Sequence, residues 1–304
     1  MRLNKYFLSF LAAIMLLLLG TAFAADPAAS GTTSVIVTAE ARKGGTPATL
    51  RQGDVMMYQK KDRLPVTEMT PLAGTPVELY IAVDETIGSN FGTQLGALTQ
   101  FVKAQPANVA VGIAYLHDGT MDIRQTPTTN HAAAAKRLGL PTQGLGTSTF
   151  ESVTDLVKQW PQSQARRELI LISTGIEPFG TNNFSNPFVD EAVAAVQRQG
   201  IPVFAIYLPP AGHWGHTYWR KTLAQTYLSQ IADESGGEGY NISVVAVSIG
   251  PHLDSINRRL QNQYRIAFTP KAPEKPGFVP IRAETEVPNV DLVTQDRVWV
   301  GGAE

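Results

Sequence analysis

The chain has 304 residues, with 25 Lys or Arg against 26 Asp or Glu, and zero cysteines. A net charge of -1 without a long run of either sign argues against nucleic acid or an anionic membrane surface as partner. The lack of cysteine excludes disulfides, thiol catalysis and Cys-ligated zinc. Stability must therefore come from the packing of an apolar core.

The first 24 residues have the pattern of a secretory signal peptide. Two basic residues precede an apolar run over 7–19, and Ala22 and Ala24 flank Phe23 as an A-x-A cleavage site. The run is shorter than the ~20 apolar residues that a membrane-spanning helix needs. We expect cleavage after Ala24, export to the periplasm or the outside, and no membrane span in the mature chain. A retained membrane anchor is the alternative.

The remaining sequence is expected to form three parts. A β segment over 25–74 ends at a Pro- and Gly-containing stretch, an α/β domain follows over 75–263, and a β-strand extension over 264–304 ends the chain. Six segments of the two flanking parts have strand-like composition: 34–42, 54–59, 64–69, 264–270, 281–287 and 296–300. The polar residues 60–63 are expected to form a turn, and the proline-rich residues 271–280 a loop.

The central part alternates strands with amphipathic helices. Residues 77–84 form an apolar strand that ends at Asp84, and a second apolar strand, 166–175, ends at a Thr-Gly turn. Strands apolar on both faces predict a doubly wound, mainly parallel sheet covered by helices. The turn at 117–119 predicts a hairpin, and therefore one antiparallel edge strand. Ser148 and Glu151 form a capping-box pattern at the start of one helix.

This order of strand, acidic loop, helix, hairpin, threonine loop and strand resembles a von Willebrand factor A domain over roughly residues 76–263. The flanking β segments are similar to those of secreted A-domain proteins described from Acidobacteria. The resemblance implies an α/β, Rossmann-like fold with small β segments at both ends. It also implies a ligand site at the carboxyl ends of the strands, as is usual in open α/β sheets.

In that family, the site is a metal-ion-dependent adhesion site with the motif D-x-S-x-S, a threonine in a second loop and an aspartate in a third. The resemblance places these residues in or beside it: Asp84 first, Thr86 for the first serine, Gly88 for the second, Ser89 one position late, Thr147 or Thr149 for the threonine, and Thr174 for the missing aspartate. One carboxylate and one hydroxyl are thus missing from the family pattern.

A dication in a partly desolvated site needs charge compensation, which only Asp84 clearly supplies. The resemblance therefore implies a degenerate site in which Asp84, Thr86 and Thr149 bind Mg²⁺ weakly or not at all. Glu85 or Glu177 could complete it if either side chain points inward. The structural alternative is that Asp84 accepts loop N–H groups while Thr86 and Thr149 cap helices.

A second candidate surface is the aromatic segment 212–219. It places Trp214 between His213 and His216, which could bind a partner protein or, as a histidine pair, ligate zinc. No nucleotide-binding loop or nucleophile elbow is present in the sequence. We expect an exported, non-enzymatic binding or scaffolding protein whose partner is a protein or cell-envelope component. The alternatives are a metal-dependent hydrolase that uses the His213/His216 loop and a purely structural envelope module.

Overall fold

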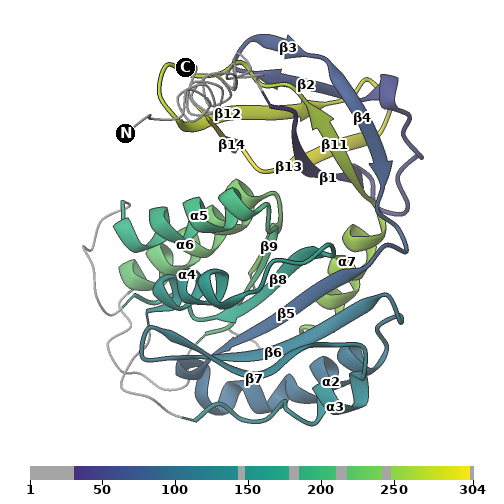
Figure 1. The fold of residues 1–304 in the computed structure, drawn as a ribbon. Coiled ribbons are helices and arrows are strands. Elements are labelled where there is room, and N and C mark those ends of the chain that lie inside the picture. Colours follow the sequence, from purple (N-terminus) through teal and green to yellow (C-terminus); the bar gives the residue numbers. More distant parts are fainter. Residues whose placement is uncertain (1–30, 143–147, 178–184, 210–217, 242–247, 302–304) are drawn as a thin grey trace, which may run out of the picture.

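The computed structural model describes residues 31–142, 148–177, 185–209, 218–241 and 248–301. Within these ranges the strands form three sheets, one of six strands and two of four strands each (Figure 1). The six-stranded sheet and its helices make up an α/β domain, and the two smaller sheets make up a second unit, here called the β unit. None of the helices in the described ranges has the length and apolar character needed to cross a membrane.

The six-stranded sheet confirms the predicted fold class. Its strands, in spatial order, are β10 (Glu238–Asn241), β9 (Val203–Tyr207), β8 (Arg166–Ser173), β5 (Val77–Asp84), β6 (Val109–His117) and β7 (Thr120–Thr128). Every neighbouring pair is parallel except β6 and β7, which form the predicted hairpin. The chain therefore builds a doubly wound, mainly parallel sheet with one antiparallel edge strand.

Helices cover both faces of this sheet (Figure 1). One face packs on α4 (Thr149–Gln159), α5 (Pro187–Gln199) and α6 (Tyr218–Ser235), and the other on α2 (Leu95–Lys103), α3 (His131–Ala135) and α7 (Gly250–Gln261). A 3-10 segment, η2 (Glu85–Thr93), joins β5 to α2. Alternate residues of β5 face opposite sides, so that Leu79 and Ile81 enter one core and Tyr80 and Ala82 the other. The strand is consequently apolar on both faces.

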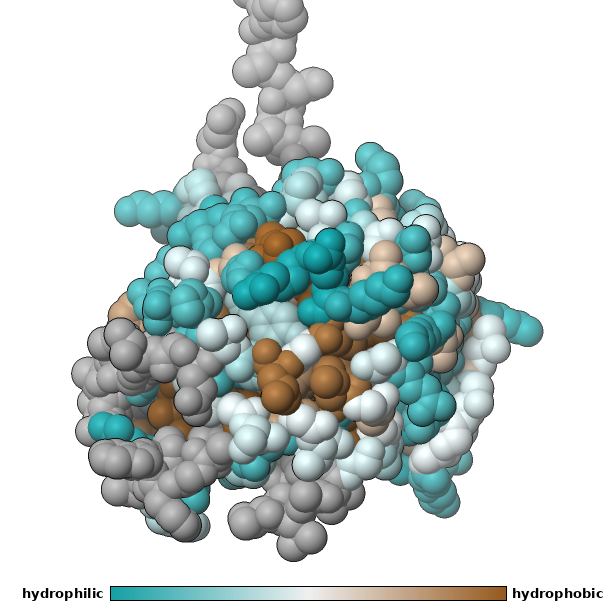
Figure 2. All heavy atoms as spheres, turned by 90° about the horizontal axis from the view of Figure 1, so that it is seen from below, coloured by the Kyte–Doolittle hydropathy of each residue, from teal (hydrophilic) through white to brown (hydrophobic). Residues whose placement is uncertain are grey.

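The side that carries α2 and α3 has a small hydrophobic area within a hydrophilic surround (Figure 2). Leu95 and Ala97 of α2 are partly buried against the core beneath this helix. Elsewhere in the domain, Gly112 of β6 lies directly beneath the ring of Tyr80, and a Cβ atom at Gly112 would stand 2.4 Å from Tyr80 Cε1. Glycine is therefore required at this position by close packing rather than by an unusual backbone angle.

The β unit is made by both ends of the chain, which the sequence did not reveal. One sheet has the order β13 (Val290–Thr294), β1 (Thr33–Ala41), β11 (Gln263–Phe268) and β4 (Val66–Pro71), and the other has the order β14 (Arg297–Val300), β12 (Gly277–Glu284), β2 (Met56–Gln59) and β3 (Asp62–Leu64). A short 3-10 turn, η1 (Gln52–Asp54), precedes β2. The two flanking segments thus share one core.

Several predicted strand limits in these segments were wrong. Four strands follow α7 rather than three, because residues 290–294 pair with β1. The expected proline-rich loop ends early, since residues 277–280 pair with β14. The expected polar turn at 60–63 is shorter, because β3 begins at Asp62 and pairs with β2. The next strand, β4, pairs with β11 in the other four-stranded sheet. Pairing between distant strands decided these limits, and local composition does not contain that information.

Arg166 holds together the two connections between the α/β domain and the β unit. Its guanidinium donates hydrogen bonds to the carbonyl of Leu72, between β4 and β5, at 3.0 Å, and to the carbonyl of Leu260, at the end of α7, at 2.8 Å. Nε of the same side chain lies 3.5 Å from Oε1 of Glu168. Glu168 is fully buried, and this burial raises the pKa of its carboxyl to about 8, against the opposing charge of Arg166.

Candidate functional site

The Asp84 side chain lies at the carboxyl edge of the central sheet, where β5 ends. Parallel pairing of β5 with β8 sets Val83 beside Ile172, so the next residues, Asp84 and Ser173, end the two strands at the same edge of the sheet. The Asp84 residue is only 1% exposed. The sequence predicted Asp84 as the first residue of the site but did not include Ser173, whose position follows from this strand register.

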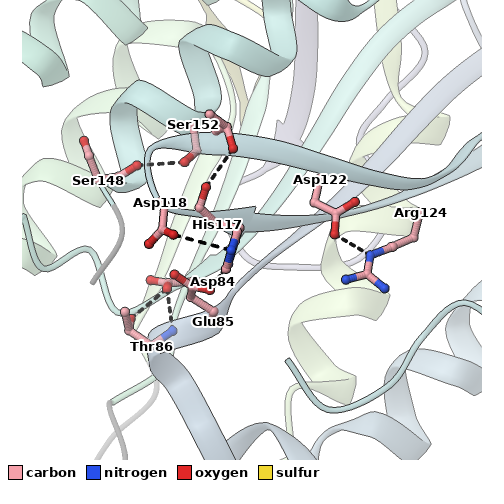
Figure 3. Close-up of polar contacts among 10 residues, drawn as sticks. Asp84, Glu85, Thr86, His117, Asp118, Asp122, Arg124, Ser148 and Ser152 are labelled. Carbon is pink, nitrogen blue, oxygen red and sulfur yellow. Dashed lines mark hydrogen bonds and ion pairs between the residues drawn. The ribbon is translucent and has the colours of Figure 1, made fainter. Parts of the chain in front are cut away.

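Both oxygens of the Asp84 carboxylate accept several hydrogen bonds. Oδ1 accepts from the backbone N–H of Thr86 at 2.8 Å and from its hydroxyl at 2.7 Å (Figure 3). Oδ2 accepts from the Ser173 hydroxyl at 2.6 Å, and from the N–H and the hydroxyl of Thr174, both at 3.2 Å. The expectation that Asp84 accepts loop N–H groups is met by the N–H groups of Thr86 and Thr174.

Further hydroxyl contacts extend this network. Thr86 Oγ1 lies 2.9 Å from Thr174 Oγ1, and Thr149 Oγ1 lies 3.0 Å from Ser173 Oγ. Ser173 Oγ also accepts a hydrogen bond from the N–H of Gly175 at 2.8 Å. The structure therefore brings together four of the predicted site residues, Asp84, Thr86, Thr149 and Thr174, in one hydroxyl–carboxylate cluster.

The capping roles proposed for Thr86 and Thr149 are wrong. Asp84 itself caps η2, because its side chain accepts the Thr86 N–H. Ser148 caps α4 by accepting the N–H of Glu151 at 3.2 Å, as the capping-box pattern predicted, and Ser152 donates its hydroxyl to the Ser148 carbonyl (Figure 3). Thr149 is the first residue of α4, where its hydroxyl is directed to Ser173 instead.

Gly88 and Ser89 do not complete the family motif. Gly88 has φ 60° and ψ −138°, a backbone conformation that is essentially confined to glycine. Ser89 is exposed, whereas Asp84 is buried. The substitution of glycine for the second serine therefore accompanies a different backbone path in η2. Thr147 and Trp214, the remaining predicted site residues, lie outside the described residues, as do His213 and His216.

Glu177 does not point toward Asp84. Its carboxylate accepts hydrogen bonds from the Ser148 hydroxyl at 2.8 Å and from the Phe150 N–H at 3.3 Å, at the start of α4. Burial raises the pKa of Glu177 to about 7, and the hydrogen bonds oppose that shift. Glu177 is thus not the substitute ligand that the sequence suggested.

Glu85 forms a second cluster beside the first. Its side chain is 2% exposed, and Oε2 lies 2.6 Å from Nδ1 of His117, which ends β6. Nε2 of His117 lies 3.4 Å from Oδ2 of Asp118 in the hairpin turn (Figure 3). The hydrogen bond to Glu85 and its negative charge raise the pKa of His117. The parallel register of Asp84 with Leu116 places Glu85 next to His117, a contact that local sequence patterns do not contain.

The donor set around Asp84 does not fit Mg²⁺. Asp84 supplies the only carboxylate among the described residues of the hydroxyl–carboxylate cluster, and its two oxygens already accept five hydrogen bonds. Mg²⁺ requires near-octahedral oxygen coordination, and a partly desolvated dication requires more negative charge than one buried carboxylate provides. The cluster is suited to hold the edge of the sheet in one conformation.

No protein-family model and no curated protein sequence matches the chain. Solved structures similar to it include the von Willebrand factor domain of the type V pili tip protein Mfa5 from Porphyromonas gingivalis, with 13% identity over 60% of this chain and 95% of that one, at a TM-score of 0.44. Another is a von Willebrand factor type A protein from Catenulispora acidiphila. It has 11% identity over 90% of this chain and 74% of that one, at a TM-score of 0.44.

The pilus adhesin SpaC from Lactobacillus rhamnosus GG is also similar, with 10% identity over 82% of this chain, at a TM-score of 0.48. The present chain spans 48% of that protein. These similarities concern the arrangement of strands and helices alone.

Proposed function

We propose that this chain is an exported, non-enzymatic binding or scaffolding protein. Its von Willebrand factor A-type domain binds a protein or a cell-envelope component at the carboxyl edge of the central sheet. Binding does not depend on a metal at Asp84. The single observation that carries this proposal is the set of five hydrogen bonds to the Asp84 carboxylate, which takes the place of ion coordination at the family's usual site.

Exposed aromatic side chains at the same edge support a binding role. Tyr218 is 85% exposed and Trp219 is 45% exposed, and both begin α6, which follows β9 along the chain. A hydrogen bond of 3.0 Å from Asn90 Nδ2 of η2 to the carbonyl of Pro209 places the end of the β9 segment beside the Asp84 loop. Aromatic residues are enriched among the anchors of protein interfaces.

The absence of cysteine gives a direct test. Tyr218→Cys introduces one thiol at this edge, and Lys61→Cys introduces one at an exposed position of the β unit, so that a thiol-reactive photo-crosslinker labels each variant once. After irradiation in intact envelopes, we expect a discrete crosslinked species from position 218 and none from position 61. The species should persist in EDTA.

Four outcomes would contradict the proposal. Crosslinks that require a divalent cation would restore the metal-dependent mode of the family. Equal crosslinking from both positions would indicate nonspecific contact, and no discrete species from position 218 would favour the purely structural module. Hydrolytic activity that disappears in a His213→Ala/His216→Ala variant would favour the hydrolase alternative instead.

A further inference from the structure

We propose that Glu85, His117 and Asp118 form a binding site for a first-row transition-metal dication such as Zn²⁺. This site is separate from the Asp84 cluster and is not needed for the binding function proposed above. The three residues come from two neighbouring segments: Glu85 begins η2, while His117 and Asp118 close the β6–β7 hairpin (Figure 3).

The three side chains lie within reach of one ion. One ligand atom from each residue lies within 4.8 Å of the others. Zinc bonds of about 2.0 to 2.2 Å place neighbouring ligand atoms roughly 3 to 3.5 Å apart. In the structure Glu85 Oε2 lies 2.6 Å from Nδ1 of His117, and Asp118 Oδ2 lies 3.4 Å from Nε2 of the same ring, so these two contacts join each carboxylate to the imidazole rather than to a shared ion position.

The two carboxylates face opposite nitrogens of the imidazole, and an ion can bond to only one of them. Coordination therefore requires the His117 ring to turn or the Asp118 carboxylate to move across it. Both side chains are about half exposed, at 49% for His117 and 53% for Asp118, so this adjustment does not disturb the core. Glu85, at 2%, provides the fixed ligand.

Burial of Glu85 supplies the energetic reason for a cation at this position. A carboxylate removed from water requires a positive partner, or its burial is costly. A protonated His117 can serve as that partner, and a metal ion can serve in its place by replacing the shared proton. The metal then satisfies both Glu85 and a neutral imidazole nitrogen, which is the form of histidine that ligates metals.

A cavity of about 280 Å³ adjoins the cluster. Glu85 and His117 line it, together with Tyr115, Asp122 and Arg124. Three protein ligands next to such a cavity leave room for water, or for an acidic group of a partner, in the remaining coordination positions.

The ligand chemistry selects the kind of ion. One imidazole nitrogen with two carboxylates suits Zn²⁺, Co²⁺, Ni²⁺ or Mn²⁺, whereas Mg²⁺ prefers an all-oxygen shell and retains its water. We therefore expect transition metals to bind at concentrations at which Mg²⁺ does not.

The test uses the chain from residue 25 onward, stripped of metal and titrated with ZnCl₂ by calorimetry and with CoCl₂ by visible absorption. The parent should bind one equivalent at this site, and its melting temperature should rise with Zn²⁺. His117→Gln should lower the affinity at least tenfold, and so should Asp118→Asn, a change that tolerates the positive φ of 48° at that turn position. Glu85→Gln is a third variant, used only after its folding has been checked because the Glu85 side chain is buried.

His252→Gln is the matched control, because His252 lies on α7, away from the cluster, and this variant should bind as the parent does. A His213→Ala/His216→Ala variant should also retain the site. The proposal is overturned if the parent binds no Zn²⁺, if His117→Gln and Asp118→Asn bind as the parent does, or if binding disappears only when His213 and His216 are replaced.

Discussion

Ser173 Oγ lies 2.6 Å from Asp84 Oδ2, so that β8 supplies a hydroxyl to the carboxylate at the end of β5. The adjacent Thr174 adds its own N–H and hydroxyl to the same oxygen. In the family that the sequence resembles, the position of Thr174 is an aspartate that contributes negative charge to a metal site. Here the N–H and the hydroxyl at the same position donate hydrogen bonds to Asp84, and these bonds connect the ends of β5 and β8.

The first prediction concerns this exchange of charge for hydrogen bonding. Adding millimolar MgCl₂ should leave the melting temperature of the parent unchanged, because stabilisation by a ligand depends on its occupancy of the folded state. Thr174→Asp places a second carboxylate beside Asp84, so this variant should be less stable in EDTA and should recover stability with MgCl₂. Differential scanning fluorimetry in EDTA and in MgCl₂ measures both effects.

The matched control for that experiment is Thr174→Asn, which has nearly the same shape without the charge and should show no response to MgCl₂. An upward shift in the parent itself would mean that Asp84 coordinates the ion despite its hydrogen bonds. We do not expect Gly88→Ser to improve binding, because a side chain at φ 60° and ψ −138° is strained.

The second prediction is that the Asp84 carboxylate has a structural role. Asp84→Ala leaves the donors of Ser173, Thr86 and Thr174 without their acceptor, and the free energy of unfolding should fall by about 2 to 4 kcal/mol. Asp122→Ala, which removes an exposed ion pair with Arg124, should change it by less than about 1 kcal/mol. Urea denaturation of both variants provides the comparison, and equal losses would contradict the role assigned to Asp84.

The third prediction tests the contact between Gly112 and Tyr80. Gly112→Ala places a methyl group 2.4 Å from the Tyr80 ring, so the free energy of unfolding should decrease by about 1 to 3 kcal/mol. Gly96→Ala is the control: no atom lies within 4 Å of the added Cβ in α2, and alanine there should stabilise the helix by roughly 0.5 to 1 kcal/mol. Opposite signs in chemical denaturation are expected, and a neutral Gly112→Ala would show that Tyr80 moves without cost.

The fourth prediction concerns pH. In the folded protein the pKa of Glu168 is about 8, so its carboxyl keeps its proton at neutral pH. In the unfolded chain the pKa of the same carboxyl is near its ordinary value of 4.5. The folded state therefore binds more protons than the unfolded state in this window, and the stability due to Glu168 declines as the pH rises from about 5 to 8. Glu168→Gln cannot ionise, so it should lose that part of the decline.

The measurement is the free energy of unfolding of the parent and of Glu168→Gln at several pH values between 5 and 9. The difference between the two should grow in favour of the variant by up to a few kcal/mol and level off above pH 8. Parallel curves would indicate that Glu168 is ionised throughout and is fully compensated by Arg166.

The α/β domain was predictable because its strands are apolar on both faces. The segments at Val77–Asp84 and Arg166–Ser173 are buried along almost their whole length, and such runs are typical of parallel strands under two helical layers. The hairpin was predictable because residues 117–119 have the composition of a tight turn between two strands. Asp84 was recognised because an acidic residue at the end of a central strand lies where open α/β sheets bind ligands.

The contacts made by Asp84 and Glu85 could not be read from local patterns. Ser173 and His117 reach these residues only through the register between neighbouring strands, and a shift of one residue would send each side chain to the other face. The joining of the two flanking segments was missed for the same reason. Residues Val37 and Thr294 pair across most of the sequence, and no short window contains both.

The pairing of β1 with β11 and β13 also sets the order in which the molecule can assemble. During synthesis, β1 emerges more than two hundred residues before either partner, while the strands and helices of the α/β domain find theirs nearby. Closing so long a loop is slow relative to local pairing, and domains emerging first can fold first. The β unit should therefore be the last part to form. Until β11 has been synthesised, β1 has neither of its partner strands, and its backbone groups stay accessible.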